Sequence, residues 1–411
     1  MPVSVDLISA AFKRDPYPTL MRMVEQGPVV ETTFPFLGKV YMVTTHAAVN
    51  ALLKDTKNFI RDPRSLGKSP LPGFNWWTPR CLKIMASGMI IRDNPDHRRL
   101  RILVDQAFSR SSMEQLQPRV EQITDDLLSE IEQKGAAGEP VDLVEGLCRP
   151  LPIAVISELL GLPPEDRDMF ANWAERFAID PSFRGLISLL PTLWKMESYV
   201  RRQIKLCRQS PRPGLLSALV DVEAEGQQLS DDEAVGMTLL LLFAGHATTT
   251  NLIGDLILEL CAHSDQKDLL FEDWSRIDGA VEEALRYSAS VLSSKPMYAV
   301  HDLKFHGLEL ERGDRVMALL SAANVDPAVF PEPFRFDILR NPNPHLAFGT
   351  GIHVCLGLKL ARLETRVAIL RLLGRFPKLE LAVPREEIRW TALKGMRGPS
   401  QLPVHLHSEQ A

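Results

Sequence analysis

The stretch that most constrains this chain is His345–Gly357, which reads HLAFGTGIHVCLG. Its single cysteine, Cys355, follows two closely spaced glycines, Gly349 and Gly351. The next segment, LKLARLETRVAILRLLGRF, has leucines at helical spacing, so we expect a helix that begins near residue 358. Unpaired backbone N–H groups at the start of that helix favour a thiolate over a thiol at Cys355. The glycines permit tight turns, so a flat ligand can lie against the backbone.

A thiolate presented from a glycine-rich loop is a suitable axial ligand for haem iron. The pattern Phe348-x-x-Gly351-x-x-x-Cys355-x-Gly357 closely resembles the haem-binding loop of the cytochrome P450 family, in particular of its soluble bacterial members. A buried cysteine before an ordinary helix is the alternative, but the four positions match by chance in only roughly one chain of this length in a thousand. The resemblance implies haem b as the cofactor and Cys355 as its iron ligand. The other loop residues that it places against the haem are Phe348, Gly349, Gly351 and Gly357.

Composition is that of an ordinary globular protein: the 411 residues are 45% hydrophobic and 24% charged. A formal net charge of −5, with no basic tail, gives no reason to expect a nucleic-acid partner. The five cysteines are scattered without a CxxC pair, which argues against a disulfide framework and for a reducing compartment. No signal segment is visible, and no apolar run reaches the roughly twenty residues needed to span a bilayer. We therefore expect a cytoplasmic monomer without a membrane contact.

Hydrophobic periodicity predicts a chain that is mainly α with a small antiparallel β portion. Near the N-terminus, helical spacing at 18–27 and 47–56 flanks strand-like segments at 28–34 and 40–45. Residues 61–92 are rich in proline and glycine and show little periodicity, so we expect a long loop with a functional role.

Helical spacing dominates the middle of the chain. It covers residues 95–209, resumes at 213–226, and continues in a long helix at about 231–262. Ser230 and Glu233 have the spacing of a capping box at the start of that long helix. Strand-like segments return only late, at 291–300, 303–316, 378–383 and 402–407.

The predicted long helix has an unusual centre, LLLLFAGHATTTN at 239–251. It is apolar all round, as a buried helix is, but Ala244, Gly245 and the three threonines after them are poor helix formers as a run. The small residues leave space for a flat cofactor and a diatomic ligand, and a hydroxyl of Thr248 that bonds back to Ala244 would bend or open the helix. A packing notch for a crossing helix is the alternative. Together with the cysteine loop, the stretch resembles the family's oxygen-binding helix, AGxxTT, which implies haem between this helix and the loop and a catalytic role for Thr248.

One position in this helix departs from the family pattern. The family usually has an acidic residue just before the threonine that helps to relay protons to oxygen, and here it is Ala247, which cannot titrate. His246 lies about 100° further round a helix, so we expect it to point elsewhere. We hypothesise that proton delivery uses water held by Thr248, or a substrate group, and is slower or leakier than usual. The proline that peroxide-using members have at the threonine position is not seen, which favours dioxygen and electrons as inputs.

Haem carries two anionic propionates, which need cationic or donor partners when partly buried. His97 and Arg101 are four residues apart on one face of a predicted helix and match the family's HxxxR pattern. The resemblance makes them propionate partners and adds His353 as a further donor; taken alone, a basic helix is more often a solvated face. A second departure is Met297, where the family commonly has an arginine.

Glu283 and Arg286 have the ExxR spacing, which puts them side by side on a helix. The spacing alone is uninformative, because about one match is expected by chance in a chain of this length. In the family this pair ties a core helix to the meander before the cysteine loop, here AANVDPAVFPEPFRFD, in which Val325 replaces a frequent arginine. We assign both residues a structural role.

The resemblance covers essentially the whole chain, and no linker is visible, so we predict a single cytochrome P450 domain over residues 1–411. It implies a monooxygenase that takes up dioxygen and two electrons, inserts one oxygen atom into its substrate and reduces the other to water. Without a flavin or nicotinamide fingerprint, the chain must draw electrons from a separate ferredoxin or flavodoxin with its reductase. We place the docking surface for that partner near Arg98, Lys359 and Arg362 as a hypothesis.

Substrate contacts in the family come from the long early loop, the mid-chain helices, the oxygen-binding helix and the segment after ExxR. The candidates in these regions are largely apolar and partly aromatic, which suits a hydrophobic, aromatic or terpenoid-like small molecule. They are Phe74, Trp76, Trp77, Met85, Met89, Trp173, Phe177, Leu240, Phe243, Val291 and Leu292, many of which are equally suited to a core. A haem-thiolate isomerase or dehydratase, a peroxide-using enzyme and a non-catalytic haem or ligand carrier are the alternatives; the first and the last do not require Thr248.

Overall fold

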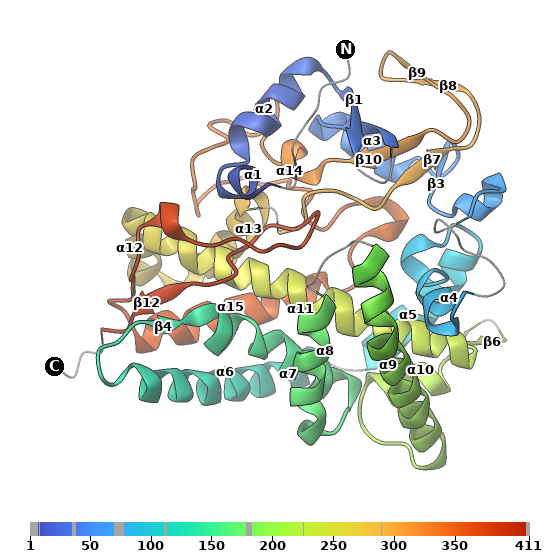
Figure 1. Ribbon diagram of the computed structural model, residues 1–411. Coiled ribbons are helices and arrows are strands. Elements are labelled where there is room, and N and C mark those ends of the chain that lie inside the picture. The colour runs from blue at the N-terminus through green and yellow to red at the C-terminus, as the bar shows by residue number, and fades with distance from the viewer. Residues whose placement is uncertain are drawn as a thin grey trace. The chain divides into compact units, whose positions relative to one another are not determined.

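The computed structural model describes residues 7, 9–34, 38–69, 78–110, 113–177, 183–224, 226–288 and 290–407 (Figure 1). Their contacts group into two compact units. Unit 1 comprises residues 1–59, 120–151 and 248–411, and unit 2 comprises residues 60–119 and 152–247. The single-domain organisation expected from the sequence stays a prediction.

Unit 1 combines short N-terminal helices, a group of C-terminal helices and most of the strands. Its helices are α1 (Ala10–Arg14), α2 (Tyr17–Gln26), α3 (His46–Lys54), α12 (Ser264–Glu272), α13 (Ile277–Ser288), α14 (Leu320–Ala323) and α15 (Leu358–Arg375), with most of α6 (Met113–Gly135). Its strands are β1 (Val29–Phe34), β2 (Gly38–Val43), β4 (Val141–Asp142), β7 (Met297–Ala299), β8 (Leu303–Phe305), β9 (Leu308–Leu310), β10 (Arg315–Ala318), β11 (Glu380–Leu381) and β12 (Pro403–His405).

The largest sheet has the strand order β1-β2-β10-β7-β3, where β3 is Phe59–Ile60. Strand β2 pairs with β1 antiparallel, with Val43 opposite Val29, and with β10 in parallel, with Tyr41 opposite Val316. Two smaller antiparallel sheets have the orders β11-β12-β4 and β8-β9. The β portion is therefore small, as predicted, and β2 and β10 form a parallel pair within it.

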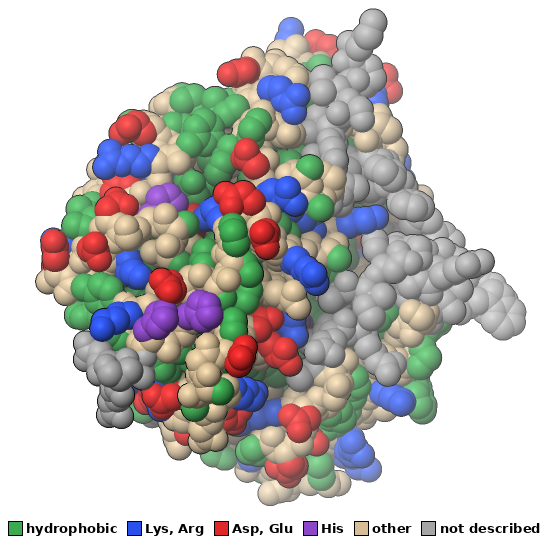
Figure 2. All heavy atoms as spheres, turned by 60° about the vertical axis from the view of Figure 1, so that its left-hand side comes forward, with side chains coloured by type: hydrophobic (Ala, Val, Ile, Leu, Met, Phe, Trp, Pro, Cys, Tyr) green, Lys and Arg blue, Asp and Glu red, His purple; other side chains and the backbone are tan. Residues whose placement is uncertain are grey.

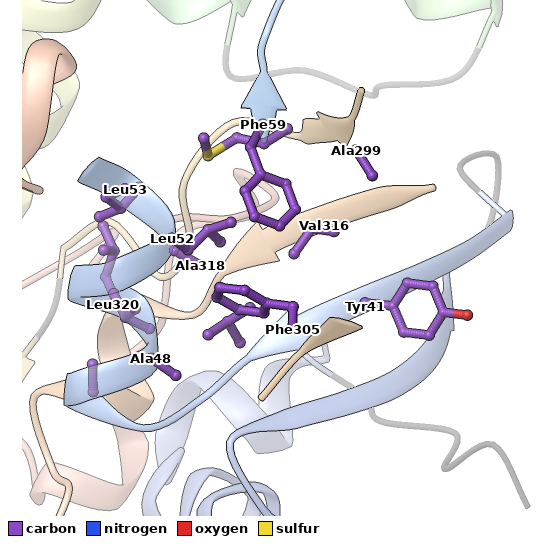
Figure 3. Close-up of a cluster of buried hydrophobic side chains, with 14 of the residues drawn as sticks. Tyr41, Ala48, Leu52, Leu53, Phe59, Ala299, Phe305, Val316, Ala318 and Leu320 are labelled. Atoms are coloured by element: carbon purple, nitrogen blue, oxygen red, sulfur yellow. The ribbon is translucent and has the colours of Figure 1, made fainter. Parts of the chain in front are cut away.

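A hydrophobic core holds helix α3 against this sheet (Figure 3). Leu52 and Leu53 of the helix lie in one cluster with Val316 of β10 and with Phe305, whose ring meets that of Phe59 edge to face at 5.2 Å. Burying one such side chain contributes about 1.5–3 kcal/mol to stability. The cluster therefore holds α3 firmly in place against the sheet.

Unit 2 is mainly helical. Its helices are α4 (Arg80–Met85), α5 (Asp96–Arg110), α8 (Arg167–Phe177), α9 (Phe183–Gln209) and α10 (Leu215–Asp221), with most of α7 (Pro150–Leu160), and β5 (Glu223–Ala224) pairs with β6 (Gln227–Gln228). The predicted loop at 61–92 was wrong in part, because it contains α4 and the 3₁₀ turns Pro63–Leu66 and Met89–Ile91. The helix predicted at 213–226 ends at Asp221, where a short hairpin replaces its last turn.

The long helix α11 spans Asp231–Ala262, which confirms the predicted bounds. Its N-terminus has the predicted capping box: the Ser230 backbone N–H donates to Glu233 Oε2 at 2.9 Å, and the Glu233 N–H donates to Ser230 Oγ at 3.3 Å. The threonine run does not open the helix, which is α-helical throughout; residues up to 247 belong to unit 2 and those from 248 to unit 1.

Acidic and basic side chains are interspersed on the face shown in Figure 2. In the part of the chain that the structure describes, no helix is both long and apolar enough to cross a membrane.

A buried ion pair ties α13 to the segment before the cysteine loop. Arg286 donates to Glu283 through Nε at 2.8 Å and through a terminal nitrogen at 2.7 Å, and both side chains are 0% exposed. Its other donors reach the carbonyl oxygens of Asn324, Pro333 and Arg335.

Glu283 is equally occupied, and its further donors come from the stretch that leads into the cysteine loop. They are the Asp337 N–H, the Arg340 guanidinium and the Asn343 side-chain amide. The pair therefore fixes the path of the backbone between 324 and 343.

We predict that Glu283→Gln lowers the free energy of unfolding by about 3–5 kcal/mol, because it leaves buried guanidinium groups without their counter-charge. Urea unfolding of the haem-free protein measures the change. The matched control is Glu332→Gln, which removes an exposed Glu–Arg pair of similar spacing and changes stability by less than about 1 kcal/mol. Equal losses in the two variants would contradict the prediction.

Candidate active site

The cysteine loop turns tightly before helix α15. The backbone forms one 3₁₀ turn, Gly351–His353, and the Cys355 N–H donates to the carbonyl oxygen of Phe348 at 3.0 Å. Cys355 is half-buried and Gly357 caps α15, so the cysteine lies just before a helix N-terminus, as predicted. Backbone N–H groups there favour the thiolate form.

Gly351 holds the loop against α3. Its φ is +73°, and a Cβ atom there would lie 2.2 Å from the carbonyl oxygen of Leu53. Only glycine permits so close an approach at that φ. Leu346, at the start of the loop, is buried in the same cluster as Leu53, and its N–H donates to Asn324 Oδ1 at 2.7 Å. The sheet core therefore positions the loop that carries Cys355.

A charged network lies behind the cysteine. Glu282 of α13 accepts hydrogen bonds from the Arg362 guanidinium and lies 2.9 Å from His345 Nε2. Burial opposes the charge on Glu282, but these partners outweigh it and lower its pKa to about 2. The Arg362 guanidinium also stacks 4.7 Å above the ring of Phe348.

The charge on Arg362 bears on Cys355. The hydrogen bond to Glu282 raises the pKa of Arg362, and the negative form of Cys355 raises it further. The same attraction stabilises the thiolate. Sequence reasoning missed Glu282, because nothing in its local pattern distinguishes it from Glu283.

Within unit 1, the part of α11 that begins at Thr248 presents a half-buried threonine, followed by buried Thr249 and Thr250. Thr248 therefore reaches a less enclosed environment than its neighbours.

Within unit 2, the preceding residues of α11 face in different directions. Ala244 is exposed, and a Cβ on Gly245 would lie 3.6 Å from Ile156, an ordinary contact that does not require glycine. His246 is buried, with Nδ1 2.8 Å from the carbonyl oxygen of Leu242, and lines a small apolar cavity with Ile156 and Phe243. The imidazole of His246 thus points into a packing cavity, in agreement with the expectation that it points elsewhere than Thr248.

Positive charge gathers around His97 on α5. The ring is 2% exposed, and burial, followed by the charges of Arg101 and Arg61, lowers its pKa to about 4. Arg101 also pairs with Asp105 at 3.0 Å. Arg61 is half-buried, and its burial lowers its pKa to about 10; its Nε has no hydrogen-bond partner among the described residues. Half-buried guanidinium groups beside a buried imidazole suit an anionic group.

Sequence reasoning missed Arg61. It lies in the region taken as a loop, where no periodicity assigns a direction to its side chain. The structure shows its backbone N–H bonded to the carboxylate of Asp93 and its guanidinium bonded to the carbonyl oxygen of Ile90.

The candidate substrate residues are dispersed. Phe74, Trp76 and Trp77 lie outside the described residues, as do the side chains of Met85 and Phe177. In unit 2, Phe243 lines the small cavity, Leu240 is half-buried, and Met89 and Trp173 are buried. In unit 1, Val291 is half-buried beside the sheet core, whereas Leu292 is buried in the cluster around α1 and α2, which favours a packing role for it.

His353 ends the 3₁₀ turn of the cysteine loop and is half-buried. Met297, at the place of the family arginine, is buried in the sheet core, where a charged head group would be costly. The described residues have the chemical character that a haem site requires. A half-buried cysteine at a helix N-terminus, with a guanidinium nearby, suits the iron ligand, and the half-buried guanidinium groups of Arg61 and Arg101 suit propionates.

The comparisons with known proteins agree with this site. A family model described as Cytochrome P450 matches residues 189–395. Vitamin D(3) 25-hydroxylase of Pseudonocardia autotrophica is 37% identical over 99% of this chain and 97% of its own, and 6-deoxyerythronolide B hydroxylase of Saccharopolyspora erythraea is 36% identical over 98% of each. The crystal structure of the myxobacterial cytochrome P450 CYP267B1 in complex with myristic acid superposes with a TM-score of 0.89, at 35% identity, and covers 98% of this chain and 99% of that one.

The chain therefore belongs to the cytochrome P450 family. It is a P450 monooxygenase, a haem-thiolate enzyme of the kind that takes up dioxygen and uses redox partners.

We predict that Gly351→Ala removes most of the bound haem, because the new Cβ collides with the Leu53 carbonyl and displaces the loop that carries Cys355. The haem content per chain and the spectrum of the reduced, carbon-monoxide-bound form measure this. Gly349→Ala is the matched control: its φ is +66°, but no atom lies within 4 Å of its Cβ position, so only the strain of about 1–2 kcal/mol remains. Equal haem loss in both variants would show that the contact with α3 does not set the loop.

Proposed function

We propose that this chain is a haem b monooxygenase that oxidises a hydrophobic small molecule with dioxygen and with electrons from a ferredoxin or flavodoxin system. The observation that carries the proposal is Cys355 before α15, on a loop that Gly351 seats against the sheet core and with the Arg362 charge behind it. Thr248 on α11 favours an oxygenase over an isomerase or a carrier, neither of which requires a hydroxyl at that position.

The chain's own residues have separate tasks in this proposal. Cys355 ligates the iron as a thiolate. Bound thiolate-ligated haem supplies the chemistry that activates dioxygen. Thr248 holds water and orients protons with its hydroxyl, since Ala247, the residue before it, cannot titrate. Arg362 and Glu282 keep Phe348 and the thiolate environment in place.

We propose His97, Arg101 and His353 as propionate partners, as the resemblance implies, and add Arg61. The Arg61 side chain is half-buried, and its buried Nε has no partner among the described residues. The charge of Arg61 lowers the pKa of His97, so the guanidinium is near enough to act on it electrostatically. Arg61 therefore offers the positive charge that Met297 lacks.

The proposed substrate is hydrophobic and of appreciable size, and an aromatic or terpenoid-like molecule fits. Support comes from the apolar candidates on α11, Leu240 and Phe243, and from relatives whose names refer to vitamin D(3), 6-deoxyerythronolide B and myristic acid. Screening such compounds for shifts of the haem spin state would narrow the class.

We expect Cys355→Ser to abolish the thiolate-type spectrum of the reduced, carbon-monoxide-bound form, because an alcohol does not replace the thiolate as a donor.

With intact Cys355, NADPH, a ferredoxin and its reductase should produce hydroxylated product from a compound that shifts the spin state. In that assay we expect Thr248→Ala to release several-fold more peroxide per NADPH, whereas Thr249→Ala, one residue on and buried, should stay near wild type. Product formed without electrons or dioxygen would refute the oxygenase proposal.

We predict that Lys359→Glu slows reduction by a ferredoxin several-fold, most at low salt, because it reverses a charge near the cysteine side, where an acidic partner would dock. Stopped-flow reduction under carbon monoxide measures the rate. Lys304→Glu, an exposed charge on the β8–β9 hairpin, is the control and should leave the rate unchanged. Arg362 is unsuitable for this test, since Glu282 holds it. An unchanged rate in Lys359→Glu would remove this surface from consideration.

A further inference from the structure

Helix α11 carries a second polar feature, two turns after Thr248. Asp255 is 0% exposed, and neither of its carboxylate oxygens has a hydrogen bond of standard geometry among the described residues, although the Ser290 hydroxyl lies near enough to lower its pKa. Its one close counter-charge is Arg397, with a terminal nitrogen 3.9 Å away, beyond hydrogen-bond distance. A buried carboxylate left in this state is costly, so the position requires an explanation.

Other buried polar atoms of unit 1 share this condition. Asn251 Nδ2, Thr250 Oγ1 and Ser288 Oγ also have no hydrogen-bond partner among the described residues. Groups of buried polar atoms without protein partners are where ordered water is found, at two to four hydrogen bonds per water. Several such atoms on one stretch of α11 and the end of α13 therefore indicate a hydrated polar site.

The C-terminal segment covers this site. A Cβ on Gly398 would lie 2.5 Å from the side chain of Asn251, and a Cβ on Gly254 would lie 2.8 Å from Pro399. Arg397 itself is 1% exposed, donates to the carbonyl oxygens of Lys13 and Ser288, and stacks 4.0 Å from the ring of Trp390. The site is thus shielded from bulk solvent by packed protein.

The surroundings of Asp255 favour its protonated form. Burial raises its pKa well above the usual value; the Arg397 and Arg385 charges and the Ser290 hydroxyl oppose that rise, and Glu259 adds to it. Glu259, one turn further along α11, differs because Arg385 binds both of its oxygens, at 2.9 and 2.5 Å. Asp255 thus resembles a carboxylic acid more than a member of an ion pair.

Helical geometry links Asp255 with Thr248. At 3.6 residues per turn, positions 248, 251 and 255 lie on one face, with Asn251 between the other two, and the full span is about 10 Å. Water that hydrogen-bonds to Asp255 and Asn251 on this face leads towards the Thr248 hydroxyl. The position that normally supplies a proton in this helix, Ala247, cannot do so.

We propose that Asp255 is a buried proton-holding residue that serves Thr248 through Asn251 and ordered water. The O–H bond of the carboxyl breaks as its proton passes to the adjoining water, which releases a proton to the next hydrogen-bonded oxygen. The carboxylate then recovers a proton along the hydrogen-bonded water that adjoins it, so no electrons move and the group is restored. Asp255 touches neither substrate nor cofactor and acts through its neighbours; the inference rests on the role proposed for Thr248.

A first experiment tests the proton on Asp255 independently of turnover. In the infrared spectrum of the holoenzyme at neutral pH, we expect a protonated-carboxyl band that shifts in deuterium oxide and is missing in Asp255→Asn. Glu259→Gln should keep the band, since Glu259 is an ion-paired carboxylate. Absence of any band that Asp255→Asn removes would overturn the proposal, whatever the enzyme's activity.

A second experiment tests the use of that proton. With NADPH, a ferredoxin and its reductase, and myristic acid as the added apolar ligand, we expect Asp255→Asn to raise the peroxide released per oxygen consumed several-fold and to increase the solvent deuterium effect on the rate. Asp255→Glu should restore much of the loss. If Asp255→Asn lowers only the unfolding temperature, and peroxide release and the isotope effect stay at wild-type values, Asp255 is a structural partner of Arg397 and the proposal fails.

Discussion

The buried pair of Glu283 and Arg286 is the interaction on which the rest of the described site depends. A buried ion pair is not in itself a source of stability, because desolvation of both charges offsets their attraction. Its value here is geometric: besides bonding to each other, Arg286 donates to three backbone carbonyls of 324–343, and both oxygens of Glu283 accept hydrogen bonds from the same segment. These bonds fix the backbone conformation of residues 324–343. As a result, Leu346, which follows this segment, packs at a defined place in the sheet core.

From that anchor, the cysteine loop is positioned by contact rather than by regular secondary structure. Gly351 permits the approach to Leu53, and a helix N-terminus follows two residues after Cys355. Electrostatic interactions also shape the surroundings of Cys355. Glu282 sits beside Glu283 on α13, and through Arg362 it keeps a positive charge near the thiolate. Helix α13 therefore contributes both the Glu283–Arg286 anchor and the carboxylate that holds Arg362 near Cys355.

Local patterns sufficed where a single element carries the signal. The cysteine loop, the bounds of α11 and its capping box follow from spacing, because helix periodicity and capping are nearest-neighbour effects. Residues 61–92 were harder: proline and glycine hide a short helix, and Arg61 acquires its role only by lying near His97. Glu282 and Asp255 could not be predicted, since their states depend on partners about 80 and 140 residues away. Met297 looked like a loss in the sequence, but it fills the sheet core.

The two departures from the family pattern have a common physical form, in which an ionisable group absent at one position has a counterpart at another position in the chain. Met297 stands in the sheet core at the position where the family commonly has an arginine. A guanidinium is instead present at Arg61, whose charge acts on His97. Ala247 stands in α11 at the position where the family usually has an acidic residue. Asp255 is a carboxyl group two turns further along the same helix, and the C-terminal segment shields it. An acid at 247 would exchange protons at the threonine itself, whereas Asp255 needs intervening donors and acceptors. Asn251 Nδ2, which has no hydrogen-bond partner among the described residues, lies on the helix face between Thr248 and Asp255. The proposed proton route therefore has a polar group at its midpoint.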